Sequence, residues 1–108
     1  MSRAEAAAVL RAAGLPVVFY QWPDGAEPVF PCIRYADEGR ADFAADGANY
    51  FKREHYSATL VSERKDDASE AALEAALEAA GVVYSKGPTT HVPAEGLYQV
   101  EYTFTLPA

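Results

Sequence analysis

The chain has 108 residues, of which 16 are acidic, nine are basic and 22 are alanine, and its formal net charge is −7. That length predicts a single domain, residues 1–108. The charge argues against binding to nucleic acid or to an anionic membrane, because both need clustered Lys and Arg. The larger core residues are nine Val, seven Leu, one Ile and 13 aromatics, enough for a small sheet covered by one or two helices.

The first third of the chain predicts a helix followed by two strands. Ser2 and Glu5 have the spacing of a capping box, and Gly14 ends the alanine-rich run, which predicts a helix over residues 3–13. PVVFYQW (16–22) and VFPCIRYA (29–36) are typical of strands, with turn residues between them. We expect these two strands to pair as a hairpin, with Pro31 at an edge or a bulge.

Residues 37–49, DEGRADFAADGAN, have no alternating pattern and predict a long loop. Its acids are four residues apart and no terminal Glu follows, so the spacing does not fit an EF-type calcium loop. A solvated loop and a protein-contact loop both remain open, since the aromatic residues here could also begin the next strand. The candidate residues for contact with another subunit or a tube are Arg40, Asp42, Phe43, Asp46 and Asn49. We expect this loop to be mobile in the free subunit and ordered at a contact.

The second half predicts a strand, a helix and two further strands. HYSATLVSE (55–63) alternates, with Tyr56, Ala58 and Leu60 on one side. VVYSK (82–86) and LYQVEYTFTL (97–106) are strand sequences, separated by a loop over 87–96. The side of the last strand that faces the core is expected to carry Tyr98, Val100, Tyr102 and Phe104.

A helix is predicted from Asp67 to about residue 80, with a second capping-box-like start. Leu73 and Leu77 form its expected buried stripe. An exposed acidic ridge is expected on the same helix, made of Glu70, Glu74 and Glu78. That ridge could be a solvated face or could line the lumen of a ring, and the pattern does not choose between them.

The predicted order is α-β-β-loop-β-α-β-β. It indicates a single small α+β domain, with a mostly antiparallel or mixed sheet of about five strands and two main helices packed on it.

No motif for catalysis, cofactor binding or metal binding is present in the sequence. His55 and His91 have no partner at metal-ligand spacing, and Cys32 is read as a buried, inert thiol rather than a nucleophile. We therefore expect no enzyme activity, no cofactor and no metal. The N-terminus lacks the apolar run of a signal peptide, and no segment approaches the roughly 20 apolar residues of a membrane span, so a cytoplasmic location is expected.

Three stretches, taken in order, resemble small tail proteins of long-tailed bacteriophages and prophages. They are LPVVFYQWPDG, NYFKREHYSATLVSERKDDASEAALEAALEAAGVVYSK and EGLYQVEYTFTL. The positions that match the family pattern are Pro16, Tyr20 and Pro23, then Asn49, Tyr50, Lys52, Tyr56, Leu60, Lys65 and Asp66, then Gly81, Tyr84 and Lys86, and finally Glu95, Tyr98, Gln99, Val100, Tyr102 and Phe104. The chain departs from the pattern in having LVS where the family has LYT, and in its alanine-rich helices.

This resemblance implies a tail terminator, also called a tail completion or head–tail joining protein. Such a protein is a structural part of the virion, has no catalytic residues and works as a homo-oligomeric ring, expected to be a hexamer. The ring caps the tail tube and joins it to the head-completion or connector protein, and DNA passes through it without specific binding. The expected location is the host cytoplasm during assembly and then the virion tail.

Two other readings stay open. One is another connector or neck protein of similar size. The other is a small host α+β module that binds a ligand or regulates a partner.

Overall fold

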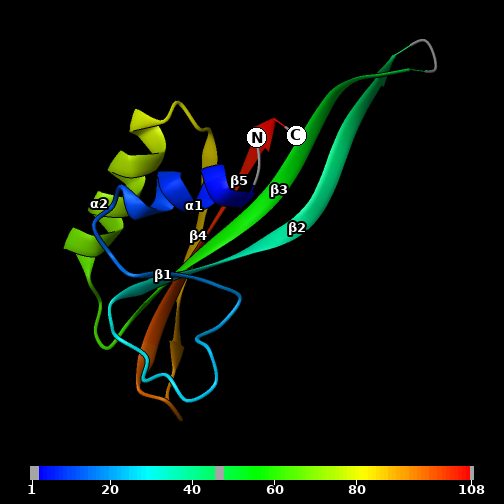
Figure 1. The fold of residues 1–108 in the computed structure, drawn as a ribbon. Coiled ribbons are helices and arrows are strands. Elements are labelled where there is room, and N and C mark those ends of the chain that lie inside the picture. Colours follow the sequence, from blue (N-terminus) through cyan, green and yellow to red (C-terminus); the bar gives the residue numbers. More distant parts are fainter. Residues whose placement is uncertain (1–2, 46–47, 108) are drawn as a thin grey trace.

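The computed structural model describes residues 3–45 and 48–107, and it describes the backbone alone at residues 3, 39–45, 48–53 and 107. Two helices and a five-stranded sheet make up the fold (Figure 1), which confirms the predicted α+β class. In chain order the elements are α1 (Arg3–Arg11), β1 (Val17–Phe19), β2 (Cys32–Ala45), β3 (Ala48–Ser62), α2 (Asp67–Ala79), β4 (Tyr84–Val92) and β5 (Leu97–Pro107).

The sheet has the strand order β1-β2-β3-β5-β4, and all neighbours are antiparallel except β1 and β2. The expectation that the first two strands form a hairpin is therefore wrong, because Val17 lies beside Ile33 and Phe19 beside Tyr35 in parallel register. Parallel neighbours need a crossover of about a dozen residues rather than a tight turn. The connection over residues 20–31 supplies that length.

Both helices lie on the same face of the sheet and contact each other (Figure 1). Beneath them is one cluster of buried side chains from α1, α2 and three of the strands: Ala6, Ala7, Leu10, Ile33, Tyr35, Tyr56, Ala58, Leu60, Leu73, Leu77, Val100, Tyr102, Phe104 and Leu106. The cluster includes the predicted core residues of the third and last strands, except Tyr98, which is half-buried. Alternation of apolar and polar residues along these strands was enough to predict which side chains are buried, because only one face of the sheet carries the helices.

The predicted loop over residues 37–49 is wrong. β2 continues to Ala45 and β3 begins at Ala48, so the two strands form one long hairpin whose connection lies outside the described residues. Cross-strand pairing runs from Cys32 beside Val61 to Ala45 beside Ala48, with two register shifts. The glycine and acidic residues that suggested a loop are accommodated in strands that pair along their whole length.

The loop predicted over residues 87–96 is also wrong in its first half. β4 runs from Tyr84 through Gly87 and Pro88 to Val92, and its pairing with β5 shifts between Lys86 and Thr89. A proline is tolerated here because β4 is an edge strand. A Cβ on Gly87 would lie only 3.2 Å from the carbonyl oxygen of Glu101, which explains the glycine at the shift.

Helix α2 is capped at both ends, but its cap lies one residue before the predicted one. Asp66 is the N-cap, and its carboxylate accepts hydrogen bonds from the backbone N–H and the hydroxyl of Ser69 at 3.0 and 2.9 Å. At the other end Gly81 has a φ of +71°, its N–H donates to Glu78 O, and Val82 N–H donates to Leu77 O. These are the two hydrogen bonds of a Schellman motif.

We predict that Asp66→Ala destabilises the protein by about 1 kcal/mol, because the N–H of Ser69 loses its acceptor. Chemical unfolding followed by circular dichroism measures this loss. The matched control is Asp67→Ala, whose side chain is 87% exposed and pairs with Lys65 at the surface, so it should cost well under that amount. Equal losses in the two variants would contradict the assignment of the cap.

Candidate functional site

The outer part of the β2–β3 hairpin projects from the body as a two-stranded arm, residues 39–45 and 48–53 (Figure 1). β5 accompanies β3 only from Arg53 to Ser62, so further out the two strands of the arm pair with each other alone within the described chain. The molecule is correspondingly long, at 50 × 29 × 23 Å. Its Cα radius of gyration is 14.9 Å, against about 13 Å for a compact domain of this length.

The arm holds the residues expected to contact another subunit. Arg40, Asp42 and Phe43 lie on β2, where their Cα partners on β3 are Glu54, Lys52 and Phe51. Asn49 lies on β3 beside Ala44, and Asp46 falls outside the described residues. The structure thus brings four of the five positions onto one ribbon instead of a loop. Their role in a contact stays a prediction.

Both long edges of the arm are open within the described chain. β1 covers the outer edge of β2 only as far as Tyr35, so residues 36–45 have no strand on that side. The outer edge of β3 is free at residues 48–52, where β5 has ended. Unpaired strand edges are templates for pairing with another chain.

The predicted acidic ridge on α2 is wrong for two of its three members. Glu70 is only 4% exposed and Glu74 is half-buried, whereas Glu78 is exposed. Glu70 pairs with Lys65 and with Lys86, the latter at 2.9 Å. A carboxylate held in this way cannot belong to a ridge that lines a lumen.

Glu74 extends this network into the sheet. Its carboxylate accepts from the hydroxyl of Tyr102 at 2.9 Å and pairs with Lys86 at 3.1 Å, and the hydroxyl of Tyr84 lies 3.4 Å away. The network therefore ties α2 to β4, to β5 and, through Lys65, to the turn before the helix. The four-residue repeat of glutamates in the sequence does not reveal this network, because it predicts that all three lie on the exposed face.

The network shifts the pKa values of its members in the directions that favour the paired state. Burial alone would raise the pKa of Glu70, but hydrogen bonds from Lys65 and Lys86 outweigh it and the pKa lies below its usual value. The pKa of Glu74 is lowered in the same way, by Lys86 and Tyr102 against burial. The two carboxylates in turn raise the pKa of Lys86.

Cys32 is fully buried, as predicted, and burial raises the pKa of its thiol. His91 stacks on Tyr98 with ring centroids 4.4 Å apart, and His55 is exposed on β3. Among the described residues, no three His, Cys, Asp or Glu side chains gather as a metal site would need.

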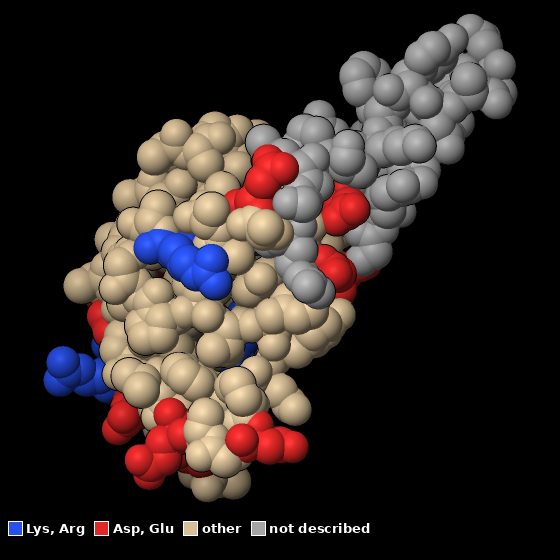
Figure 2. Space-filling view, in the orientation of Figure 1, with Lys and Arg blue, Asp and Glu red and all other residues tan. Residues whose placement is uncertain are grey.

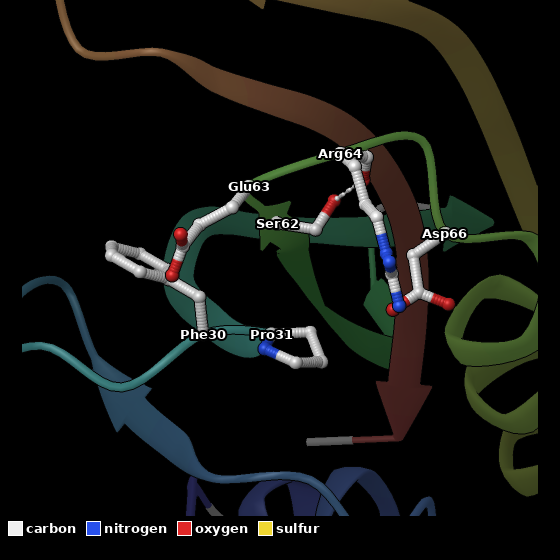
Figure 3. A pocket seen from close by; sticks show the side chains of 6 residues that line it. All are labelled: Phe30, Pro31, Ser62, Glu63, Arg64 and Asp66. Atoms are coloured by element: carbon white, nitrogen blue, oxygen red, sulfur yellow. Dashed lines mark hydrogen bonds between the residues drawn. The ribbon is translucent and has the colours of Figure 1, made fainter.

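Two cavities open where the 20–31 connection meets the sheet. One, of about 290 Å³, lies between Phe30–Pro31 and the end of β3 (Figure 3). Its wall includes Ser62, whose hydroxyl donates to the carbonyl of Arg64 at 2.7 Å. The Arg64 side chain extends toward Asp66 in the same view.

The second cavity, of about 330 Å³, lies beside the first and shares Phe30 with it. Its other lining residues are Trp22, Pro28, Cys32, Arg34, Val61, Glu95, Leu97 and Gln99. Trp22 Nε1 and Arg34 Nε are buried and have no hydrogen-bond partner in the described structure. Buried donors of this kind are normally satisfied, so this cavity is a candidate ligand site.

The face seen in Figure 2 carries more acidic than basic side chains. Asp and Glu gather at the end of the body away from the arm and again near the arm's base, and Lys and Arg are few there. Neither described helix is long and apolar enough to cross a membrane.

A comparison with protein-family models finds no match, and a search of curated proteins also finds none.

We predict that Glu70→Gln flattens the acid side of the stability profile. The pKa of Glu70 is lower in the folded than in the unfolded state, so its contribution is full above about pH 5 and is lost as the pH falls through the folded pKa. The free energy of unfolding, measured by urea titration from pH 7 to pH 3, should therefore fall less steeply in the variant.

The control for this experiment is Glu78→Gln on the exposed face of the same helix. It should reproduce the wild-type pH dependence. A wild-type slope in Glu70→Gln would show that this carboxylate does not hold the network.

Proposed function

We propose that the chain is a structural assembly protein of long-tailed bacteriophages or prophages, a tail terminator that caps the tail tube and joins it to the head connector. It works without catalysis, as a ring of identical subunits, expected to be a hexamer, through which DNA passes. The ordered resemblance along most of the chain supports the family, and one structural observation supports the mode of action. That observation is the projecting arm.

A two-stranded hairpin is marginally stable in water when nothing packs on it. The arm extends beyond β5, and the described body offers it no third strand. Such a ribbon gains most when another molecule covers its faces or extends its edges. In the proposed ring, the covering molecule is a neighbouring subunit or the last ring of the tube.

The charge of the protein fits a passage for DNA. A formal charge of −7 disfavours condensation of DNA onto the ring wall, because phosphates are repelled. A neck protein of similar size remains the near alternative. An experiment that tests whether the protein caps tail tubes distinguishes it from a tail terminator.

We predict that the wild-type protein forms a discrete ring and that the arm is required for it. The test variant replaces residues 41–53 with Asn-Gly, a dipeptide suited to a tight hairpin between Arg40 and Glu54. No member of the described core cluster lies in the deleted segment, so the body should keep its cooperative unfolding. Size-exclusion chromatography with light scattering should give a ring for the wild type and a monomer for the variant.

Electron microscopy of purified tail tubes supplies the functional readout. Wild-type protein should bind one end of the tube and stop its growth, and the arm variant should not. A wild-type protein that stays monomeric at all concentrations and leaves tubes uncapped would contradict the proposal.

The cavity beside Trp22 favours a second candidate function, a module that binds a small organic anion. The lining combines apolar side chains with the buried donors of Trp22 and Arg34, the composition of many small-molecule sites. In this candidate, an apolar group would fill the cavity and a carboxylate would accept from the two donors.

Titration with phenylacetate tests this candidate, because Trp22 is the single tryptophan of the chain and reports on the cavity by its fluorescence. The candidate predicts a saturable change with phenylacetate, a weaker one with phenylacetamide, and loss of that difference in Arg34→Met. Arg64→Met, in the neighbouring cavity, is the control. No response to either compound would remove the candidate.

A further inference from the structure

Tyr20 has a backbone conformation that bulky residues rarely adopt. Its φ is +63°, and it is the one non-glycine residue with positive φ in the described backbone. Gln21 N–H donates to Phe19 O at 2.8 Å, which closes a three-residue turn around Tyr20. Turns of this kind with a positive central φ are rare and strained. Glycine would occupy the position without a steric penalty.

The side chain of Tyr20 does not repay this strain inside the subunit. It is 55% exposed, and its described ring contact is with Phe19, at 4.3 Å between centroids. Phe19 in turn packs on Tyr35 at 5.0 Å, and Tyr35 belongs to the core. The turn therefore holds an aromatic ring outward at the end of a rigid aromatic row. Strain retained at a residue whose side chain stays more than half exposed points to a use for that side chain.

Tyr20 lies where the free edge of β2 begins. Its N–H donates to Tyr35 O at 2.8 Å, and this is the last bond that covers the outer side of β2 before residues 36–45. A strand laid along that edge would meet Tyr20 at its end. Exposed tyrosines of this type are frequent anchors in protein interfaces.

The same ribbon supplies a strand that fits this edge. Residues 36–45 contain three acids and one base, a charge of −2, and residues 48–52 contain one base and no acid, a charge of +1. The outer edge of β3 at residues 48–52 is free on the opposite side of the ribbon. A second copy can therefore present a basic strand edge to the acidic one by ordinary strand addition.

We propose that Tyr20 is a contact residue for a second copy of this chain, docked along the free edge of β2 through the outer edge of its own β3. The two edges differ, so the contact is head-to-tail and repeats from subunit to subunit. This inference rests on the proposed function insofar as both require self-assembly, and it adds the surface and the anchoring residue.

Three variants separate the contact from the strain. Tyr20→Phe keeps the ring, Tyr20→Ala removes it and keeps the strain, and Tyr20→Gly removes both. Assembly is measured by light scattering over a concentration series, and thermal stability by circular dichroism at a concentration where all proteins are monomeric. The wild type and the arm variant are measured beside them.

Tyr20→Phe should assemble like the wild type, and the alanine and glycine variants should need at least tenfold more protein for the same assembly. The glycine variant should melt about 4–8 °C above the alanine variant, since only glycine relieves the backbone. Because Tyr20→Gly relieves the backbone strain, loss of the ring in this variant cannot be attributed to a damaged fold.

Wild-type assembly that persists unchanged in Tyr20→Gly, while the arm variant is monomeric, would overturn this inference and leave the proposed function standing. A wild-type monomer would overturn self-assembly in both. A wild-type monomer that caps tubes through Tyr20 would instead assign the residue to the tube protein and overturn the second-copy contact.

Discussion

The antiparallel pairing of β2 with β3 is the constraint on which the body and the arm both depend. Its inner half places Ile33, Tyr35, Tyr56 and Leu60 under the helices, so register is fixed there by burial. Its outer half continues the pairing beyond β5 after a register shift between Asp37 and Gly39, and there no third strand of the described chain accompanies it. The core therefore sets the direction and the phase of the arm, and an error in core register would displace the surface that the arm presents.

The strands with a buried face could be predicted from the sequence, and the segments whose structure depends on pairing with a distant strand could not. Alternation located the core sides of β3 and β5, because helices cover one face of the sheet. The segment over residues 37–49 has no alternating pattern, and within residues 37–45 and 48–49 it is the pairing of the two strands that marks them as extended. Without that pattern, its acids and glycines suggested a loop. The parallel partner of β1 depended on where the 20–31 connection crosses, which local sequence does not encode.

The buried glutamates were predictable in principle. At about 100° per residue, Glu70 projects some 20° from Leu77 around the helix axis, so the wheel already placed it beside the buried stripe rather than on the opposite face. A helical wheel does not show which residues pair with Glu70. Lys86 lies 16 residues beyond Glu70 in the numbering, and only the β4–β5 pairing brings it under α2. Without Lys86 known as a partner, a buried glutamate would not be predicted, because burying an unpaired charge has a high free-energy cost.

The repeat in α2 poses a register problem that the ends of the helix resolve. EAALEAALEAA repeats every four residues, so a slide of four would exchange Leu73 with Leu77 and one glutamate with the next. Asp66 and Gly81 occur outside the repeat, and each fixes one end through its own hydrogen bonds. Because α2 cannot slide, Glu70 and Glu74 meet Lys86 and Tyr102 in a single arrangement. The sheet beneath is thereby held in one register as well, and the β2–β3 pairing carries it to the arm across two register shifts at set positions. The two unlike edges of the arm can extend from copy to copy only if every subunit presents them in the same phase.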